Sequence, residues 1–207
     1  MDKKNNIIQC KIILVGESGV GKTSIINRYL DKYTENQKET IGASYAKKVE
    51  KIDNYEINLD IWDTAGQEKF RVVNTIFYKE AYICLLVFDI TKKETFEKLK
   101  EYWYNTVKES ADLDIIFGVA GNKIDLYENE EVDENDVLEY CKEINASYYK
   151  TSARSNTSID ATFRDLAKKF MDTDIFKTMA ENVNVSIKNK IKLDGNQPIV
   201  QKKKSFC

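Results

Sequence analysis

The sequence of 207 residues contains no histidine. Imidazole is therefore excluded as a general base, a nucleophile or a metal ligand. Any chemistry must use carboxylates, amides, lysines, hydroxyls or a bound metal ion. Proline is nearly absent too, because its single residue, Pro198, lies in a polar stretch late in the sequence.

Cysteines and apolar runs are also few. The four cysteines lie far apart without metal-ligand spacing, and two of them fall in apolar or helical patterns typical of reduced, buried thiols. The longest apolar run, 81–88, is too short to span a bilayer, and the polar residues 1–6 contain no apolar core of a secretion signal. We therefore expect a protein of the reducing cytosol.

Charge is unevenly distributed along the chain. Six lysines against Glu181 and Asp194 give residues 181–207 a formal charge of +4, which leaves −6 on residues 1–180 because the whole chain carries −2. Apolar periodicity fades from about residue 172. We expect one domain over residues 1–172 and a flexible basic tail over residues 173–207. We also expect a monomer without a nucleic-acid partner.

Hydrophobic periodicity predicts the fold class. Apolar or alternating stretches predict strands at 7–15, 44–52, 55–61, 81–88, 114–120 and 147–151. Helical patterns fall near 22–31, 68–79, 93–109, 133–145 and 157–171. This alternation predicts an α/β fold with a six-stranded, mostly parallel sheet and helices on both faces. The two-residue polar connection at 53–54 predicts a hairpin, which puts one antiparallel strand at the sheet edge.

The first predicted strand is followed by GESGVGKT at residues 16–23 and then by a helical pattern. This is the spacing of a P-loop, in which backbone N–H groups turn around a phosphate. Lys22 can reach the β- and γ-phosphates, and the Thr23 hydroxyl can bind Mg²⁺. A plain glycine-rich turn would not explain Lys-Thr at this offset. The residues expected to contact the nucleotide here are Ser18, Gly19, Val20, Gly21, Lys22, Thr23 and Ser24.

Five further segments follow in order: ETIGASY at 39–45, LDIWDTAGQEKFR at 59–71, LVFDIT at 86–91, GNKIDL at 121–126 and TSA at 151–153. With these segments, residues 8–171 resemble the Rab branch of the Ras-like small GTPases. The resemblance implies a Ras-like G domain of the P-loop NTPase class. It also implies a switch that binds GTP or GDP, hydrolyses GTP with Mg²⁺ and recruits effectors during vesicle traffic.

The resemblance implies that the segment at 121–126 binds guanine, at the carboxyl end of a buried strand, where ligands bind in open α/β sheets. The Asp125 carboxylate can accept hydrogen bonds from N1–H and the 2-amino group of guanine, a pair of donors that adenine lacks. The resemblance implies that Asn122 braces the loop and contacts the base and that the Lys123 stem covers it. It implies further that Ser152 and Ala153 complete the site.

The resemblance also assigns residues around the γ-phosphate. Gln67 would orient the attacking water, while Lys22 and the Gly66 N–H would stabilise the transferring phosphoryl. No arginine of the chain is placed to assist, so intrinsic hydrolysis should be slow and accelerated by a partner.

Mg²⁺ would be held by Thr23, Thr40 and, through a water, Asp63. Tyr33 would pack on the edge of the guanine. Loss of the γ-phosphate would release segments 32–44 and 64–75 together, which is the switching event.

Partner surfaces follow from the same resemblance. The residues implied to face effectors are Ile41, Gly42, Tyr45, Trp62 and Phe77, although an aromatic on a strand is also an ordinary core residue. The implied partners are exchange factors, GTPase-activating proteins, effectors and a GDP-dissociation inhibitor or escort protein.

The chain ends in KKKSFC, with Cys207 as the last residue. Rab-type tails usually end in two cysteines, and C-a-a-X endings place the cysteine fourth from the end, so prenylation of Cys207 is a hypothesis. One lipid chain and a polybasic patch together could give reversible attachment to the cytoplasmic face of intracellular membranes. The alternative is a solvated basic tail with an unmodified thiol.

Three other functions remain open on the sequence alone. A P-loop ATPase or nucleotide kinase would need to accept adenine, against the pattern of Asn122, Lys123 and Asp125. A nucleotide-locked scaffold is disfavoured by Thr23 and Gln67. A Ras-like signalling GTPase on the same fold is the nearest alternative.

Overall fold

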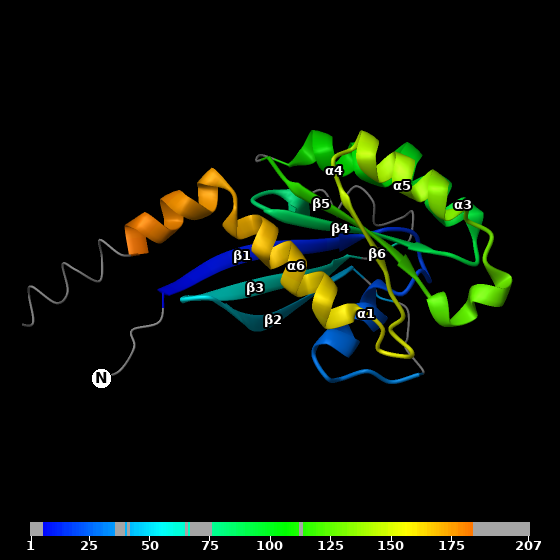
Figure 1. The fold of residues 1–207 in the computed structure, drawn as a ribbon, viewed down its shortest axis with the longest axis horizontal. Coiled ribbons are helices and arrows are strands. Elements are labelled where there is room, and N and C mark those ends of the chain that lie inside the picture. The colour runs from blue at the N-terminus through cyan, green and yellow to red at the C-terminus, as the bar shows by residue number, and fades with distance from the viewer. Residues whose placement is uncertain are drawn as a thin grey trace, which may run out of the picture.

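The computed structural model describes residues 6–35, 40, 42–64, 66, 76–111 and 114–183. Its centre is a six-stranded sheet in the order β2-β3-β1-β4-β5-β6 (Figure 1). Strands β2 and β3 are antiparallel, and the other neighbours are parallel, so the predicted fold class is confirmed. The strands are β1 (Asn6–Val15), β2 (Ala43–Ile52), β3 (Tyr55–Thr64), β4 (Ile83–Asp89), β5 (Ile116–Asn122) and β6 (Ser147–Lys150).

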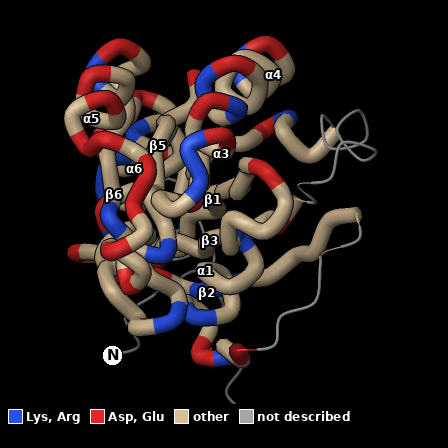
Figure 2. The backbone as a smooth tube through the Cα atoms, turned by 90° about the vertical axis from the view of Figure 1, so that its right-hand side faces the viewer, with Lys and Arg blue, Asp and Glu red and all other residues tan. Residues whose placement is uncertain are grey.

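Helices cover both faces of the sheet because the central strands are apolar on both sides. Every residue of β4 is buried. Along β1, Ile12 and Leu14 join the core beneath α1 (Lys22–Tyr29) and α6 (Ile159–Met171), while Ile13 and Val15 join the core beneath α3 (Lys93–Lys98), α4 (Tyr104–Ser110) and α5 (Glu134–Glu143). Charged residues of both signs lie on the outer turns of α4 and α5 (Figure 2). These helices are therefore amphipathic, with their apolar residues against the sheet.

The helix predicted at 93–109 contains a turn of π-helix at Leu99–Trp103, between α3 and α4. Such a turn widens the helix by one residue, and Trp103 at its end is fully buried. The helix predicted at 68–79 is described only at its end, where residues 76–78 are helical.

Residues 173–207 are expected from the sequence to form a flexible tail, but residues 174–183 form a further helix beyond α6 (Figure 1). The Thr173 hydroxyl caps this helix, because it accepts a hydrogen bond from the Phe176 N–H at 3.2 Å. Phe176 and Ala180 are buried, and the Phe176 ring lies 5.1 Å from Tyr55 and 5.6 Å from Phe170 between centroids. This part of the expected tail therefore packs on the domain. The boundary at residue 172 stays a prediction, and residues 184–207, with Cys207, lie outside the described part of the chain.

The packing of Phe176 predicts its contribution to stability. Replacing this buried ring by alanine removes its contacts with Tyr55 and Phe170 and leaves a cavity, so Phe176→Ala should lower the free energy of unfolding by about 3 kcal/mol. Urea denaturation followed by circular dichroism measures the loss. The neighbouring Lys177→Ala is the control, because Lys177 is exposed and its ion pair with Asp174 lies on the surface, so its loss should change the stability little. A midpoint for Phe176→Ala equal to that of the control would contradict the docked helix.

Candidate functional site

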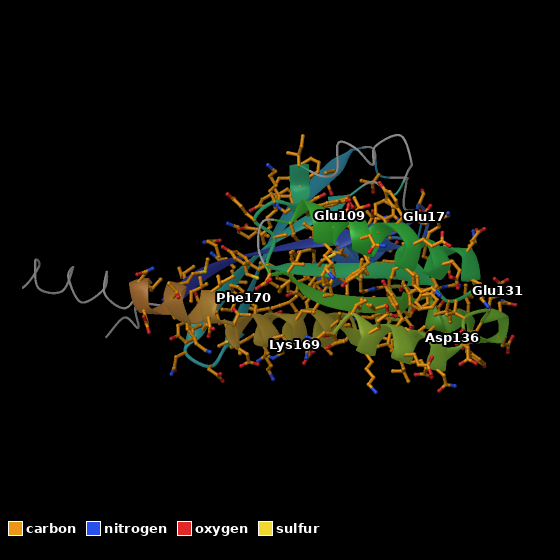
Figure 3. The ribbon with its side chains drawn as sticks, turned by 90° about the horizontal axis from the view of Figure 1, so that it is seen from above. Glu17, Glu109, Glu131, Asp136, Lys169 and Phe170 are labelled. Carbon is orange, nitrogen blue, oxygen red and sulfur yellow. The ribbon has the colours of Figure 1, made fainter. Side chains whose placement is uncertain are left out.

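A cavity of about 330 Å³ opens at the carboxyl edge of the sheet. It is bordered by the loop after β1, by the start of α1 and by the loops after β5 and β6. The predicted nucleotide residues that line it are Ser18, Gly19, Gly21, Lys22, Thr23, Ser24, Tyr33, Thr40, Gly66, Asn122, Lys123, Asp125 and Ala153. Segments far apart in sequence therefore meet around one space. Its end of the sheet is opposite the end that carries the helix at 174–183, as the positions of Glu17 and Phe170 in Figure 3 show.

Two of the predicted nucleotide-binding residues do not line the cavity but lie behind it. Val20 is buried in the core, and its carbonyl accepts a hydrogen bond from Asn122 Nδ2 at 2.8 Å. Ser152 is also buried and donates from Oγ to Asp125 Oδ1 at 2.5 Å. Three lining residues were not predicted, and these are Thr64, Leu126 and Arg154.

The loop after β1 requires glycine where it turns under the cavity. A Cβ on Gly16 would lie 2.1 Å from the Val87 carbonyl oxygen, and φ is +146° there. The Lys22 ammonium lies along the loop and donates to the carbonyls of Gly16 at 2.8 Å and Glu17 at 3.0 Å. Burial lowers the pKa of Lys22 to about 8, because the charged form is desolvated. A bound phosphate would stabilise the charged form and raise this pKa again.

Three oxygen-bearing side chains meet beside the Lys22 site. Thr23 Oγ1 lies 2.6 Å from Asp63 Oδ2 and 2.6 Å from Thr40 Oγ1, and the Thr40 hydroxyl lies 3.3 Å from the same carboxylate oxygen. Asp63 is buried, and its other oxygen, Oδ1, makes no hydrogen bond within the described part of the chain. Desolvation raises the pKa of Asp63. Hydrogen bonds from Thr23 and Thr40 and the positive charge of Lys22 act in the opposite direction but do not cancel this effect.

This oxygen cluster fits Mg²⁺. A hard cation takes oxygen ligands and commonly binds through one or two carboxylates together with substrate phosphates and water. A cation bound here would compensate the unpaired Oδ1 of Asp63 and would explain why a carboxylate is buried at this point. The described residues hold no group of three or more His, Cys, Asp or Glu side chains that could bind a metal alone. A metal ion here would therefore need the phosphates of a bound nucleotide as further ligands.

Gly66 packs directly on the loop after β1. A Cβ on Gly66 would lie 2.5 Å from the Glu17 carbonyl carbon and 2.5 Å from the Ser18 nitrogen, which are backbone atoms that cannot yield. The same loop is held from its other side, because Trp103 Nε1 donates to Glu17 Oε1 at 2.9 Å. The next residue, Gln67, lies outside the described residues, so its predicted place beside the attacking water stays a prediction.

Asn122 joins the two halves of the cavity. Its Nδ2 holds the Val20 carbonyl of the loop after β1, and its Oδ1 accepts from the Ala153 N–H at 3.3 Å. A Cβ on Gly21 would lie 2.3 Å from this Nδ2, so the close approach depends on glycine. Asn122 thereby links the phosphate loop, residues 16–23, to the loop after β6.

The two charged residues of the base loop, residues 122–126 after β5, are held in place by other residues of the protein. Lys123 has a φ of +70°, and its Nζ lies 2.6 Å from Oδ2 of the buried Asp89. The Asp125 carboxylate accepts from Ser152, which is itself buried. Each charge is therefore preorganised by a partner outside the cavity.

Comparisons with known proteins decide the family. The Ras family model matches residues 11–172. RabJ of Dictyostelium discoideum is 38% identical over 172 residues, which is 83% of this chain and 67% of RabJ. Human Rab-22A is 37% identical over 167 residues (80% of this chain and 86% of Rab-22A), and Rab-1 of Theileria parva is 36% identical over 163 residues (78% and 74%). The chain is a Rab-like member of the Ras family.

As a Ras-family GTPase, the Rab-like protein hydrolyses GTP, and its family implies a role in membrane trafficking. The alternatives of a P-loop ATPase, a nucleotide kinase and a Ras-like signalling protein are thereby set aside. No helix among the described residues is both long and apolar enough to cross a membrane.

The aromatic residues predicted to face effectors form one row on the Rab-like domain. The Trp62 ring lies 5.3 Å from Tyr45 and 5.1 Å from Phe77 between centroids. Tyr45 is 51% exposed and donates a hydrogen bond to Asp60, so it is not an ordinary core residue. Gly42 precedes the row at the start of β2, whereas Ile41 lies outside the described residues.

Proposed function

We propose that this Rab-like protein is an Mg²⁺-dependent switch that distinguishes GTP from GDP through segments 32–44 and 64–75. The observation that carries the proposal is the cavity at the sheet edge, where Thr40 and Gly66 line the same space as the phosphate loop. Each of these two residues belongs to one of the segments. Both can therefore respond to the same terminal phosphate.

The nucleotide would lie across the cavity from the phosphate loop to the base loop. Lys22 and the N–H groups of residues 18–24 would hold the phosphates at the start of α1, where the helix dipole favours anions. The guanine would meet Asp125 and the Ala153 N–H, with Tyr33 at its edge. Asp125 and Ala153 are both held by neighbouring side chains, which supports base recognition by groups fixed in advance.

Hydrolysis transfers the γ-phosphoryl of GTP to a water molecule. The bond from the γ-phosphorus to the β–γ bridging oxygen breaks, GDP leaves, and a proton of the water passes to the phosphate that forms. We assign the orientation of that water to Gln67 and charge stabilisation to Lys22 and the Gly66 N–H. Thr23 and Thr40, together with Asp63 through a water, would hold Mg²⁺, which would supply further positive charge to the phosphates. Of the described arginines, Arg28 and Arg154 lie nearest the cavity, and both are beside Ala153, where the guanine would bind. A GTPase-activating partner would therefore have to accelerate hydrolysis.

We infer the partners and the membrane attachment of the protein from its family. Effectors would read the row Tyr45, Trp62 and Phe77 together with Ile41 and Gly42, while exchange factors would open the nucleotide site. A GDP-dissociation inhibitor or escort protein would bind the tail. A lipid on Cys207 and the preceding lysines would together bind the cytoplasmic face of intracellular membranes.

Hydrogen exchange tests the switch. The protein loaded with a non-hydrolysable GTP analogue should exchange more slowly than the GDP-loaded protein in segments 32–44 and 64–75, with β5 unchanged as the internal reference. Thr40→Val keeps the side-chain shape but removes the hydroxyl near Asp63, so the difference should shrink in segment 32–44. Equal exchange of both segments in the two nucleotide states would refute the proposal.

A further inference from the structure

The last turn of α1 carries an arginine whose side chain connects two parts of the cavity wall. Arg28 Nε donates to the Ala153 carbonyl at 2.6 Å, and Arg28 Nη2 donates to the Arg154 carbonyl at 2.9 Å. The carbon at the centre of the guanidinium lies 3.8 Å from the centroid of the Tyr33 ring. One planar cation therefore uses its edge for the loop after β6 and its face for the aromatic ring.

The backbone after α1 brings Tyr33 to this position. The Asp31 N–H donates to the Arg28 carbonyl at 3.1 Å, and the Lys32 N–H donates to the Asn27 carbonyl at 2.7 Å, with Asp31 at a φ of +59°. This turn reverses the chain so that Tyr33 returns over Arg28. Tyr33 and Ala153 both line the cavity, whereas Arg28 does not.

We infer that Arg28 is a positioning residue that slows nucleotide release by clamping Tyr33 to the loop after β6. The inference rests on the proposed placement of guanine between Asp125, Ala153 and Tyr33. The Ala153 N–H and carbonyl flank the same α-carbon, so the hydrogen bond from Arg28 to the carbonyl restrains the position of the N–H. The base can leave only when the ring or the loop moves, and Arg28 resists both movements.

A second link between the same segments offers a matched control. Arg154 Nε lies 3.9 Å from Glu35 Oε1, and both side chains are mostly exposed to solvent. Exposed pairs of this kind contribute little to stability. The clamp is therefore the half-buried guanidinium of Arg28 and not the surface ion pair of Glu35.

The experiment measures the release of a fluorescent GDP analogue from the full chain. Arg28→Met keeps the aliphatic stem but removes the donors and the charge, and it should speed release by about tenfold or more. Arg28→Lys keeps the charge without the planar guanidinium, so its release rate should lie between those of the wild type and Arg28→Met. Glu35→Gln should release the analogue within about twofold of the wild-type rate. Single-turnover hydrolysis of preloaded GTP should stay within about twofold for all three, because Arg28 does not approach the phosphates.

A double-mutant cycle with Tyr33→Leu separates the clamp from a general loosening of the fold. If Arg28 acts through the ring, the effects of Arg28→Met and Tyr33→Leu on the logarithm of the release rate should be less than additive. Additive effects, or release from Arg28→Met at the wild-type rate, would overturn the inference. Weak GDP binding by the wild type would instead contradict the proposed nucleotide site. If Arg28→Met does not fold, Arg28→Lys takes its place in both measurements.

Discussion

Asp125→Asn should lower the affinity for GDP by a factor on the order of 10⁴, because a guanine in this site would lose its paired acceptor. The carboxylate offers two oxygens to the N1–H and the 2-amino group, whereas a carboxamide offers one oxygen and directs an N–H₂ group at the second donor. Ser152 can still donate to the remaining oxygen, so the loop itself should persist. Calorimetry with GDP and ADP measures the change and the base preference.

The same geometry predicts a gain as well as a loss. Xanthine carries a carbonyl where guanine carries the 2-amino group, so an asparagine at position 125 can pair with both its N1–H and its oxygen. Asp125→Asn should therefore bind xanthosine diphosphate more tightly than GDP. Asp136→Asn removes the same charge from the exposed face of α5 and should leave both affinities unchanged. If Asp125→Asn still bound GDP more tightly than xanthosine diphosphate, other residues would have to recognise the guanine.

Much of this architecture can be predicted from the sequence because its strands and motifs are local patterns. The run 81–88 is apolar without alternation, and β4 is buried along its whole length. The polar pair at 53–54 separates two β-rich stretches, and β2 and β3 pair as a hairpin across it. The P-loop and the base loop follow the first and fifth strands, and in a parallel sheet both must reach the same edge.

Other features depend on contacts that no local pattern contains. The π-helical turn at Leu99–Trp103 is one, since it is fixed by burial of Trp103 and its bond to Glu17, 86 positions away. Arg28 is another, because an arginine in a last helical turn is an ordinary solvated residue until the turn at Asp31 returns Tyr33 over it.

The helix at 174–183 could have been found from the sequence. Its apolar residues recur at helical spacing, and they are Ile175, Phe176, Met179, Ala180 and Val183. The surrounding Asp, Lys and Asn residues conceal this pattern when the tail is judged by composition. Thr173 also precedes the run as a capping residue, which is a second local indication. Tertiary packing on Tyr55 and Phe170 then holds a helix that is too short to be stable alone.

The Thr23 hydroxyl is the centre of the proposed metal site, because it lies within 2.6 Å of both Asp63 and Thr40. Thr23→Asn replaces this oxygen by a longer amide that cannot fit the same position between a carboxylate and a hydroxyl. The orphaned Oδ1 of Asp63 would then lose the cation that compensates its burial. Binding of GTP should be weakened more than binding of GDP, because Mg²⁺ would stabilise the charge of the terminal phosphate and Thr40 belongs to the segment that would meet that phosphate.

Thr23→Asn should accordingly weaken Mg²⁺-dependent binding of GTP by about 100-fold or more, while the protein stays folded. Chelation of Mg²⁺ by EDTA should speed GDP release from the wild type but leave the variant almost unaffected, since its metal is already lost. Thr23→Ser is the matched control, because it keeps the hydroxyl and should bind GTP within a few-fold of the wild type. Unchanged GTP affinity in Thr23→Asn, or equal sensitivity of both proteins to EDTA, would remove Thr23 from the metal site and leave Asp63 without an explanation for its buried charge.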